Sequence, residues 1–279
     1  MRNWTNRLGN PQRQGDYIDP ETGLLVCGIC GEAKQRRIEL LGRQEVVPVA
    51  CRCVREENAV RKEALAQEKA AYRLARRRTS CFGEDDKKAG FTFATDDRRD
   101  VQLSDRVRGY VQHFAEFRRE GRGLLLLGPN GTGKTFYACC IANALLEAGY
   151  SARVTNFALI ASELQGTFDK QGVHNALLRT DLLVLDDLAA ERDTAFMNEI
   201  VFQVIDARCA TQKPMIVTSN LSAQAFFKPD TIERGRVFSR LKEVCIPLSV
   251  TGTDRREEQL RQRMADDLAR LHSNDMEAK

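Results

Sequence analysis

Residues 128–135 match the pattern G-x-x-x-x-G-K-[ST], which is typical of a loop that binds phosphate. The apolar run 124–127 before the loop predicts a buried strand, and the Ala- and Leu-rich stretch 136–148 after it predicts a helix. Glycines let the backbone turn several N–H groups toward phosphate oxygens, and the helix N-terminus adds a partial positive charge. An ordinary glycine-rich turn is the alternative, and the combined strand, loop and helix disfavour it.

The last two residues of this loop carry its chemistry. Lys134 would reach the β- and γ-phosphates of ATP, and the hydroxyl of Thr135 would bind Mg²⁺. The residues that would contact the nucleotide are Gly128, Pro129, Asn130, Gly131, Thr132, Gly133, Lys134 and Thr135.

Two aspartates end a second apolar run, at 182–185. Asp186 would hold Mg²⁺, directly or through water, and Asp187 would orient and deprotonate the water that attacks the nucleotide. A helix-capping turn is the alternative for such a pair, and it is weaker beside a phosphate loop. Asn220 follows a third apolar run, at 215–218, where it would hydrogen-bond the same water or the γ-phosphate.

The elements around these residues alternate between strand and helix. Strands are predicted at 151–155, 182–185, 215–218 and 247–250, and helices at 101–120, 157–168, 194–210 and 254–271. This alternation predicts an α/β fold with a parallel sheet covered by helices on both faces. The catalytic groups would then gather at the carboxyl ends of the strands.

Four of the nine cysteines cluster near the start of the chain, as Cys27, Cys30, Cys51 and Cys53. Two extended stretches, 37–41 and 45–50, lie between the pairs and predict a hairpin, which is the layout of a zinc ribbon. A segment this small lacks a sufficient core, so zinc would supply free energy of folding. Four free buried cysteines are the alternative.

The stretch 54–78 has no Gly or Pro and predicts one helix with a strongly basic end, at 73–78. One interpretation is that this end contacts nucleic acid or an acidic partner. The other is that the stretch is a solvated linker helix, with cations near its C-terminus because the helix dipole stabilises them there. Residues 79–100 predict an irregular boundary, which Phe82, Phe91 and Phe93 would dock onto the following domain.

The composition sets broad limits. At 279 residues, with 42% hydrophobic and 29% charged residues, the chain predicts one large domain or two smaller ones. The net charge of +4 permits contact with nucleic acid without arguing for it. No stretch has the apolar length that spans a bilayer, and the N-terminus lacks the apolar core of a signal peptide, so a cytoplasmic protein without membrane contact is expected.

Arginines recur near the predicted edge of the domain, three of them within 232–241, followed by Arg255 and Arg256. They are either surface charge or groups that stabilise the transferred phosphate across a subunit boundary.

The segments 128–135, 182–188, 215–221 and 236–241 together resemble the AAA+ ATPases of the DnaC/DnaI type, the replicative helicase loaders. The resemblance covers roughly residues 17–256. The cysteine module before a basic helix and the boundary Phe91-Thr92-Phe93 are similar to those of the DnaI-like and bacteriophage members.

This resemblance implies roles for particular residues. Lys134, Thr135, Asp186 and Asp187 take the nucleotide and hydrolysis roles given above. Asn220 matches the sensor 1 position, Arg240 the arginine finger, and Arg255 the sensor 2 arginine. The family also places a DNA-facing insertion before the strand that ends in Asp186, at the 157–168 helix and the loop to Gly172. Phe168 would stack there on a base, and Lys170 would contact a phosphate. Packing of Phe168 in the core is the alternative.

Two positions depart from the wider AAA+ pattern. Asp187 stands where many AAA+ proteins carry Glu, which leaves the strength of hydrolysis open, and Thr253-Asp254 stands where an aromatic residue is usual.

The expected organisation has four parts: a leader and zinc-ribbon-like module (1–54), a basic helical linker and boundary loop (55–100), an AAA+ ATPase domain (101–256) and a helical tail (257–279). The implied function is an ATP-dependent loader that places a hexameric replicative helicase on single-stranded DNA and self-associates through its ATPase domains. Its cofactors would be ATP, Mg²⁺ and Zn²⁺. A transposition helper ATPase of the IstB kind, and a zinc-bearing adaptor with ATP as a structural switch, are the alternatives.

Overall fold

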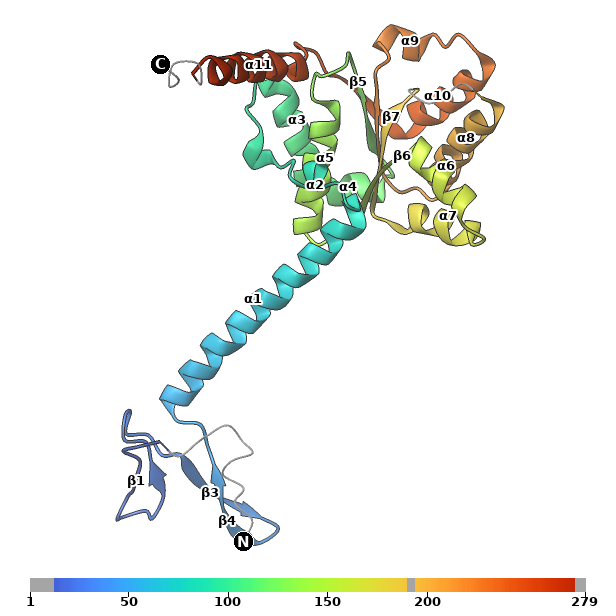
Figure 1. Ribbon diagram of the computed structural model, residues 1–279. Helices are drawn as coiled ribbons and strands as arrows, with labels where there is room; N and C mark the ends of the chain where they lie inside the picture. Colours follow the sequence, from blue (N-terminus) through green and yellow to red (C-terminus); the bar gives the residue numbers. More distant parts are fainter. Residues whose placement is uncertain (1–12, 190–193, 274–279) are drawn as a thin grey trace. The chain divides into compact units, whose positions relative to one another are not determined.

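The computed structural model describes residues 13–189 and 194–273 (Figure 1). The chain forms two compact units, and the division between them falls within the long helix α1 (Arg52–Phe82), at residues 73 and 74. The predicted division into four parts is finer than this one. None of the helices among the described residues is both long enough and apolar enough to cross a membrane.

The N-terminal unit consists of short antiparallel pairs of strands. Strand β1 (Tyr17–Ile18) pairs with β2 (Leu25–Val26), and β3 (Gln35–Leu40) pairs with β4 (Arg43–Pro48). The two residues between β3 and β4 both have positive φ, 52° at Leu41 and 73° at Gly42, as a two-residue type I′ hairpin turn requires. The hairpin predicted between the two cysteine pairs is therefore present.

A buried ion pair and a very small apolar core stabilise this unit. The ammonium of Lys34 donates to the carboxylate of Asp16, and both side chains are almost fully buried. The other oxygen of the Asp16 carboxylate accepts from the backbone N–H of Gly28, within the first cysteine pair. Among the residues of this unit that the structure describes, the buried apolar cluster consists of Cys27, Cys51 and Val54.

The C-terminal unit is built on a five-stranded parallel sheet, as the alternating pattern predicts. Its strands are β5 (Gly123–Leu127), β6 (Ala152–Asn156), β7 (Leu182–Leu188), β8 (Met215–Ser219) and β9 (Cys245–Ser249), in the order β6-β7-β8-β5-β9. The strand that leads into the phosphate loop, β5, lies between β8 and β9. A side chain at Gly123 would collide with the carbonyl oxygen of Met215, because a Cβ there would lie 1.8 Å from it.

Helices cover both faces of this sheet, as Figure 1 shows. Leu124 and Leu126 of β5 point into one core, and Leu125 and Leu127 point into the other. The first core is covered by α3 (Val101–Gln112), α4 (Phe114–Arg119) and α5 (Lys134–Glu147). The second is covered by α6 (Phe157–Gly166), α7 (Lys170–Arg179), α8 (Ala195–Ala210), α9 (Ala223–Phe227) and α10 (Ile232–Val244).

The basic end of α1, which belongs to the C-terminal unit, packs on α5. Two of its arginines contact the C-terminal end of α5: Arg77 donates to the carbonyl oxygen of Leu146, and Arg78 pairs with Glu147 at 2.8 Å. Cations at a helix C-terminus are stabilised by the helix dipole. For these two arginines, the structure therefore favours a structural role over contact with a separate partner.

The predicted boundary is more ordered than an irregular loop. Helix α1 ends four residues beyond its predicted end, and helix α2 (Asp86–Ala89) and a 3₁₀ helix, η2 (Phe93–Thr95), follow it. Phe82 is buried in the first core, and Phe91 and Phe93 pack against it. The docking role predicted for these three phenylalanines is confirmed.

Three predicted elements differ in the structure. The helix expected at 101–120 is two helices, α3 and α4, separated at His113. The helix expected at 157–168 ends at Gly166. Helix α7 was not predicted; its N-cap Asp169 accepts from the N–H of Gly172 at 2.8 Å. The last strand lies at 245–249 rather than 247–250. The tail is helical as predicted, in α11 (Arg255–Ser273), and four of its apolar side chains are exposed: Leu260, Met264, Leu268 and Leu271.

A fully buried arginine, whose role was not predicted from the sequence, joins the amino ends of β7 and β8. The guanidinium of Arg208 donates to five carbonyl oxygens, those of Leu177, Leu178, Thr180, Asp181 and Pro214. Burial lowers the pKa of Arg208 to about 10. Because these carbonyl groups are buried or partly buried, their hydrogen bonds avoid a desolvation cost.

Candidate functional site

The phosphate loop connects β5 to α5 at the carboxyl edge of the sheet, as predicted. Three of its glycines have positive φ: 154° at Gly128, 73° at Gly131 and 102° at Gly133. A Cβ at Gly128 would lie 2.0 Å from the carbonyl oxygen of Val250, and one at Gly131 would lie 1.8 Å from Oδ1 of Asp254. The loop therefore requires glycine for its backbone conformation and for close packing.

Lys134 is the first residue of α5, and its side chain folds back over the loop. Its ammonium donates to the carbonyl oxygens of Gly128 at 2.9 Å and Pro129 at 2.6 Å. Burial lowers the pKa of Lys134, while the negative charges of Asp187 and Asp186 oppose this shift. The side chain thus lies over the loop, close enough to both aspartates to feel their charge.

The two predicted Mg²⁺ ligands lie together. The hydroxyl of Thr135 donates to Oδ1 of Asp186 at 2.8 Å, and Asp186 is buried. The hydroxyl of Thr218, on the neighbouring strand β8, donates to the same oxygen at 2.8 Å. Hydroxyl and carboxylate oxygens are ligands that suit Mg²⁺, so this donor set fits the ion. Thr218 was missed because nothing in its local sequence shows which strand lies beside it.

Asp187 is held in an unusual backbone conformation. Its φ is 60°, and the pairing of β7 with β8 is irregular between Leu185 and Leu188. The backbone N–H of Asp187 donates to the hydroxyl of Thr218 at 2.8 Å. Thr218 therefore fixes both aspartates, because the same hydroxyl accepts from Asp187 and donates to Asp186. Asp187 is exposed at the surface, but partial removal from water raises its pKa, and the charge of Asp186 adds to this shift.

The lysine of α2 also belongs to this site and was not identified from sequence. Lys88 Nζ lies 3.3 Å from Oδ2 of Asp186, the oxygen that the two threonines leave open. A lysine in a polar boundary segment carries no local signal for such a contact.

The residues predicted as sensors lie in different surroundings. Asn220 directly follows β8, at the same edge of the sheet, and is exposed. The backbone N–H of Arg255 donates to the carbonyl oxygen of Gly131 at 3.1 Å, and its guanidinium pairs with Asp97 at 3.0 Å. The charge of Arg256, by contrast, acts on both Lys134 and Asp187: it adds to the lowering of the Lys134 pKa and opposes the rise in the Asp187 pKa. The roles of Asn220 and Arg255 stay predictions.

Arg240 lies on α10 and forms salt bridges with two carboxylates of its own chain. Its guanidinium is 2.8 Å from Asp206 and 3.2 Å from Glu243. The role of Arg240 as a finger that acts on a neighbouring subunit stays a prediction.

Phe168 is fully exposed, between α6 and α7. The alternative that it packs in the core is therefore wrong. Lys170 begins α7, so both residues are placed for solvent or a ligand, and their contact with DNA stays a prediction.

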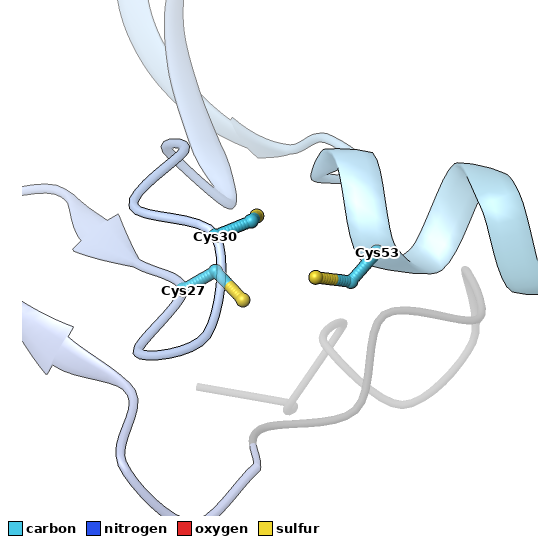
Figure 2. Close-up of side chains that lie close together, drawn as sticks. All are labelled: Cys27, Cys30 and Cys53. Carbon is cyan, nitrogen blue, oxygen red and sulfur yellow. The ribbon is translucent and has the colours of Figure 1, made fainter.

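In the N-terminal unit, three of the predicted zinc ligands converge. The sulfur atoms of Cys27, Cys30 and Cys53 lie within 4.8 Å of one another. Figure 2 shows that the first two come from one turn and that Cys53 comes from the first turn of α1. Hydrogen bonding by the backbone of Cys53 lowers the pKa of Cys30 to about 6, which favours the thiolate that metals bind.

Cys51 lies near these three cysteines, but it does not belong to the group whose sulfur atoms all lie within 4.8 Å of one another. It is fully buried and packs in the same small core. Burial raises the pKa of Cys51, and its thiol also interacts with the thiols of Cys27 and Cys30. Four neighbouring thiols are the donor set of a structural zinc site, so the residues fit this ion.

The phosphate loop, the paired aspartates and the parallel sheet define a nucleotide-binding protein of the P-loop class with an AAA+ fold. Residues 54–262 match the family described as IstB-like ATP binding protein, and the chain belongs to this family.

Two curated relatives share the ATP-binding region. Over 176 residues, the chain is 28% identical to the replicative helicase loader DnaI of Bacillus subtilis (strain 168). This match covers 56% of this chain and 57% of that protein. Over 176 residues it is 27% identical to the replicative helicase loader DnaC of Escherichia coli (strain K12), covering 60% of this chain and 71% of that one. The matched region is thus little more than half of the DnaI relative.

A crystal structure of DnaI has the same fold as the C-terminal unit. It superposes with a TM-score of 0.54 at 21% identity, covering 64% of this chain and 99% of that one.

Replacing Lys134 tests the nucleotide site. Lys134→Ala removes a partly buried ammonium that would bind phosphate, so ATP affinity is expected to fall about tenfold to 100-fold. Isothermal titration with ATP and Mg²⁺ measures this. Lys170→Ala, at an exposed lysine, serves as the control and should bind normally. Unchanged affinity in Lys134→Ala would exclude this loop as the phosphate site.

Metal analysis tests the cysteine site. Purified protein is expected to contain about one Zn²⁺ per chain. Replacement of Cys30 or Cys51 by Ser should lower the zinc content, whereas Cys209→Ser in the other unit should leave it unchanged. Chelation should unfold the N-terminal unit and preserve ATP binding, because only the smaller unit depends on metal. Protein without zinc, in which all nine thiols react freely, would contradict the assignment.

Proposed function

We propose that this protein is an ATP-dependent loader that places a hexameric replicative helicase on single-stranded DNA. The observation that carries the proposal is the buried Asp186, held against Thr135 beneath a glycine-dependent phosphate loop. That arrangement supports binding of Mg²⁺ and ATP, and the similarity to proteins named replicative helicase loaders supports the biological role.

At the site, the N–H groups of the loop and the ammonium of Lys134 would bind the phosphates. Phosphate oxygens compete with the two loop carbonyls that Lys134 now contacts, because charge-assisted hydrogen bonds are stronger than neutral ones. Thr135 and Asp186 would hold Mg²⁺, which neutralises charge on the phosphates. Asp187 would orient the attacking water and accept its proton.

The other parts of the chain would serve assembly. The zinc-ribbon-like unit and α1 would bind the helicase, and the ATP-binding units would associate side by side on DNA. Hydrolysis would then release the loader. The exposed Phe168 and Lys170 are the side chains that we expect to contact single-stranded DNA.

The name of the matched family favours a second candidate, a transposition helper ATPase of the IstB kind. The cysteine unit is the feature that separates the two, because such helpers are expected to carry a helical N-terminal piece. An adaptor that binds ATP without turnover is a third candidate, and steady-state ATP hydrolysis separates it from both enzymes.

Capture of the cognate replicative helicase tests the loader function. Immobilised protein is expected to retain the helicase with and without ATP, and a Cys30→Ser variant should lose it because the N-terminal unit is disrupted. The control is Cys209→Ser, which should retain the helicase. Retention of the cognate transposase in place of the helicase would identify the transposition helper, and failure to bind the helicase in either condition would exclude the loader.

Mixing two variants tests the role of Arg240. Arg240→Ala should bind ATP normally and lose assembly-stimulated hydrolysis, because an arginine finger acts on charge in the transition state. Lys134→Ala lacks a working site and keeps Arg240. Mixed together, they should recover activity at shared boundaries.

The control for this experiment is Arg234→Ala, on the same helix and paired with Asp230. It should keep hydrolysis. If the mixture stays inactive although the chains co-assemble, Arg240 does not act in trans and serves only its own pairs with Asp206 and Glu243.

A further inference from the structure

The carboxylate of Asp186 has its two oxygens in different surroundings. Oδ1 accepts the hydroxyls of Thr135 and Thr218, each at 2.8 Å. Oδ2 faces the ammonium of Lys88 at 3.3 Å. The charge partner of this buried carboxylate therefore comes from α2, outside the elements that carry the phosphate loop and the paired aspartates.

Lys88 has a second acidic partner on its own helix. Its ammonium lies 3.8 Å from Oδ2 of Asp85, whose side chain is 42% exposed, whereas the side chain of Asp186 is 6% exposed. The ammonium thus lies between a buried carboxylate and a solvated one. A small movement of one flexible side chain would exchange these partners.

Helix α2 itself is anchored independently of Lys88. The side-chain amide of Asn143, on α5, donates to the carbonyl oxygens of Ala89 at 3.1 Å and Phe91 at 2.9 Å. Asp85 caps the helix by accepting the N–H of Lys88 at 3.0 Å. The backbone can therefore stay in place while the Lys88 side chain moves.

A divalent cation beside Asp186 conflicts with this arrangement. Two cations on one carboxylate repel each other, and the repulsion is strong where water is largely excluded. Lys134 already places a further positive charge near Asp186 and Asp187.

We propose that Lys88 is a built-in competitor of Mg²⁺, a positioning residue that neutralises Asp186 until Mg²⁺ binds and then transfers its ammonium to Asp85. This inference rests on the proposed Mg²⁺–ATP site. The Mg²⁺ concentration that nucleotide binding requires would then depend on Lys88 and Asp85, in the segment that follows α1.

The test measures binding of a fluorescent ATP analogue over a range of Mg²⁺ concentrations, with the full chain. Lys88→Met removes the competing charge, so the Mg²⁺ concentration for half-maximal binding should fall about threefold to tenfold. Asp85→Asn keeps a capping residue and weakens the second partner, so the same concentration should rise. Lys87→Met, at the exposed neighbouring lysine, is the matched control and should behave as the parent chain.

Each result decides the proposal. A lower Mg²⁺ midpoint in Lys88→Met together with a higher one in Asp85→Asn supports it. An unchanged midpoint in Lys88→Met, or weaker nucleotide binding at saturating Mg²⁺, overturns it, since the second result would make Lys88 a phosphate ligand. If Lys88→Met does not fold, an Asp85→Asn chain with an unchanged or lower midpoint overturns it instead. Failure of the parent chain to bind the analogue at any Mg²⁺ concentration would count against the nucleotide site itself.

Discussion

The buried carboxylate of Asp186 is the constraint on which the ATP-binding unit depends. A carboxylate removed from water is costly unless donors surround it, and here the donors come from separate elements. Thr135 comes from α5, Thr218 from β8 and Lys88 from α2. Satisfying one side chain thus fixes the position of the phosphate loop, the pairing of β7 with β8 and the placement of the segment after α1.

The two units rely on different sources of stability. In the C-terminal unit, alternate residues of each central strand fill two cores, so both faces of the sheet remove apolar surface from water. In the described part of the N-terminal unit, from residue 13 on, the core consists of Cys27, Cys51 and Val54, and the unit also contains the buried pair of Lys34 and Asp16. Its cysteines lie where a metal would add the missing free energy, so the proposed zinc is also the proposed reason that this unit folds.

The structure also chose between open alternatives. The basic end of α1 could have contacted nucleic acid or an acidic partner, or could have been part of a linker helix. Arg77 and Arg78 contact the end of α5, which favours a structural role for these two arginines. Phe168 also had two interpretations, and its full exposure excludes the core. At the start of α11, Arg255 pairs with Asp97, whereas the charge of Arg256 is among those that act on Lys134 and Asp187. The role of Arg255 as the sensor 2 arginine stays a prediction.

The sequence by itself determined the features that depend on neighbours in the chain. The glycines of 128–135, the aspartates that end an apolar run and the spacing of strands and helices are local patterns, and each predicted its element. The four cysteines form two closely spaced pairs, and this spacing is also a local pattern.

Only the tertiary structure decided which distant groups complete these features. Lys88, Thr218 and Arg208 occupy unremarkable sequence positions, and their roles follow from the order β6-β7-β8-β5-β9 and from the docking of α2 on α5. Strand order and helix docking join residues far apart in the chain, and the periodicity of a single segment carries no information about its neighbours in space.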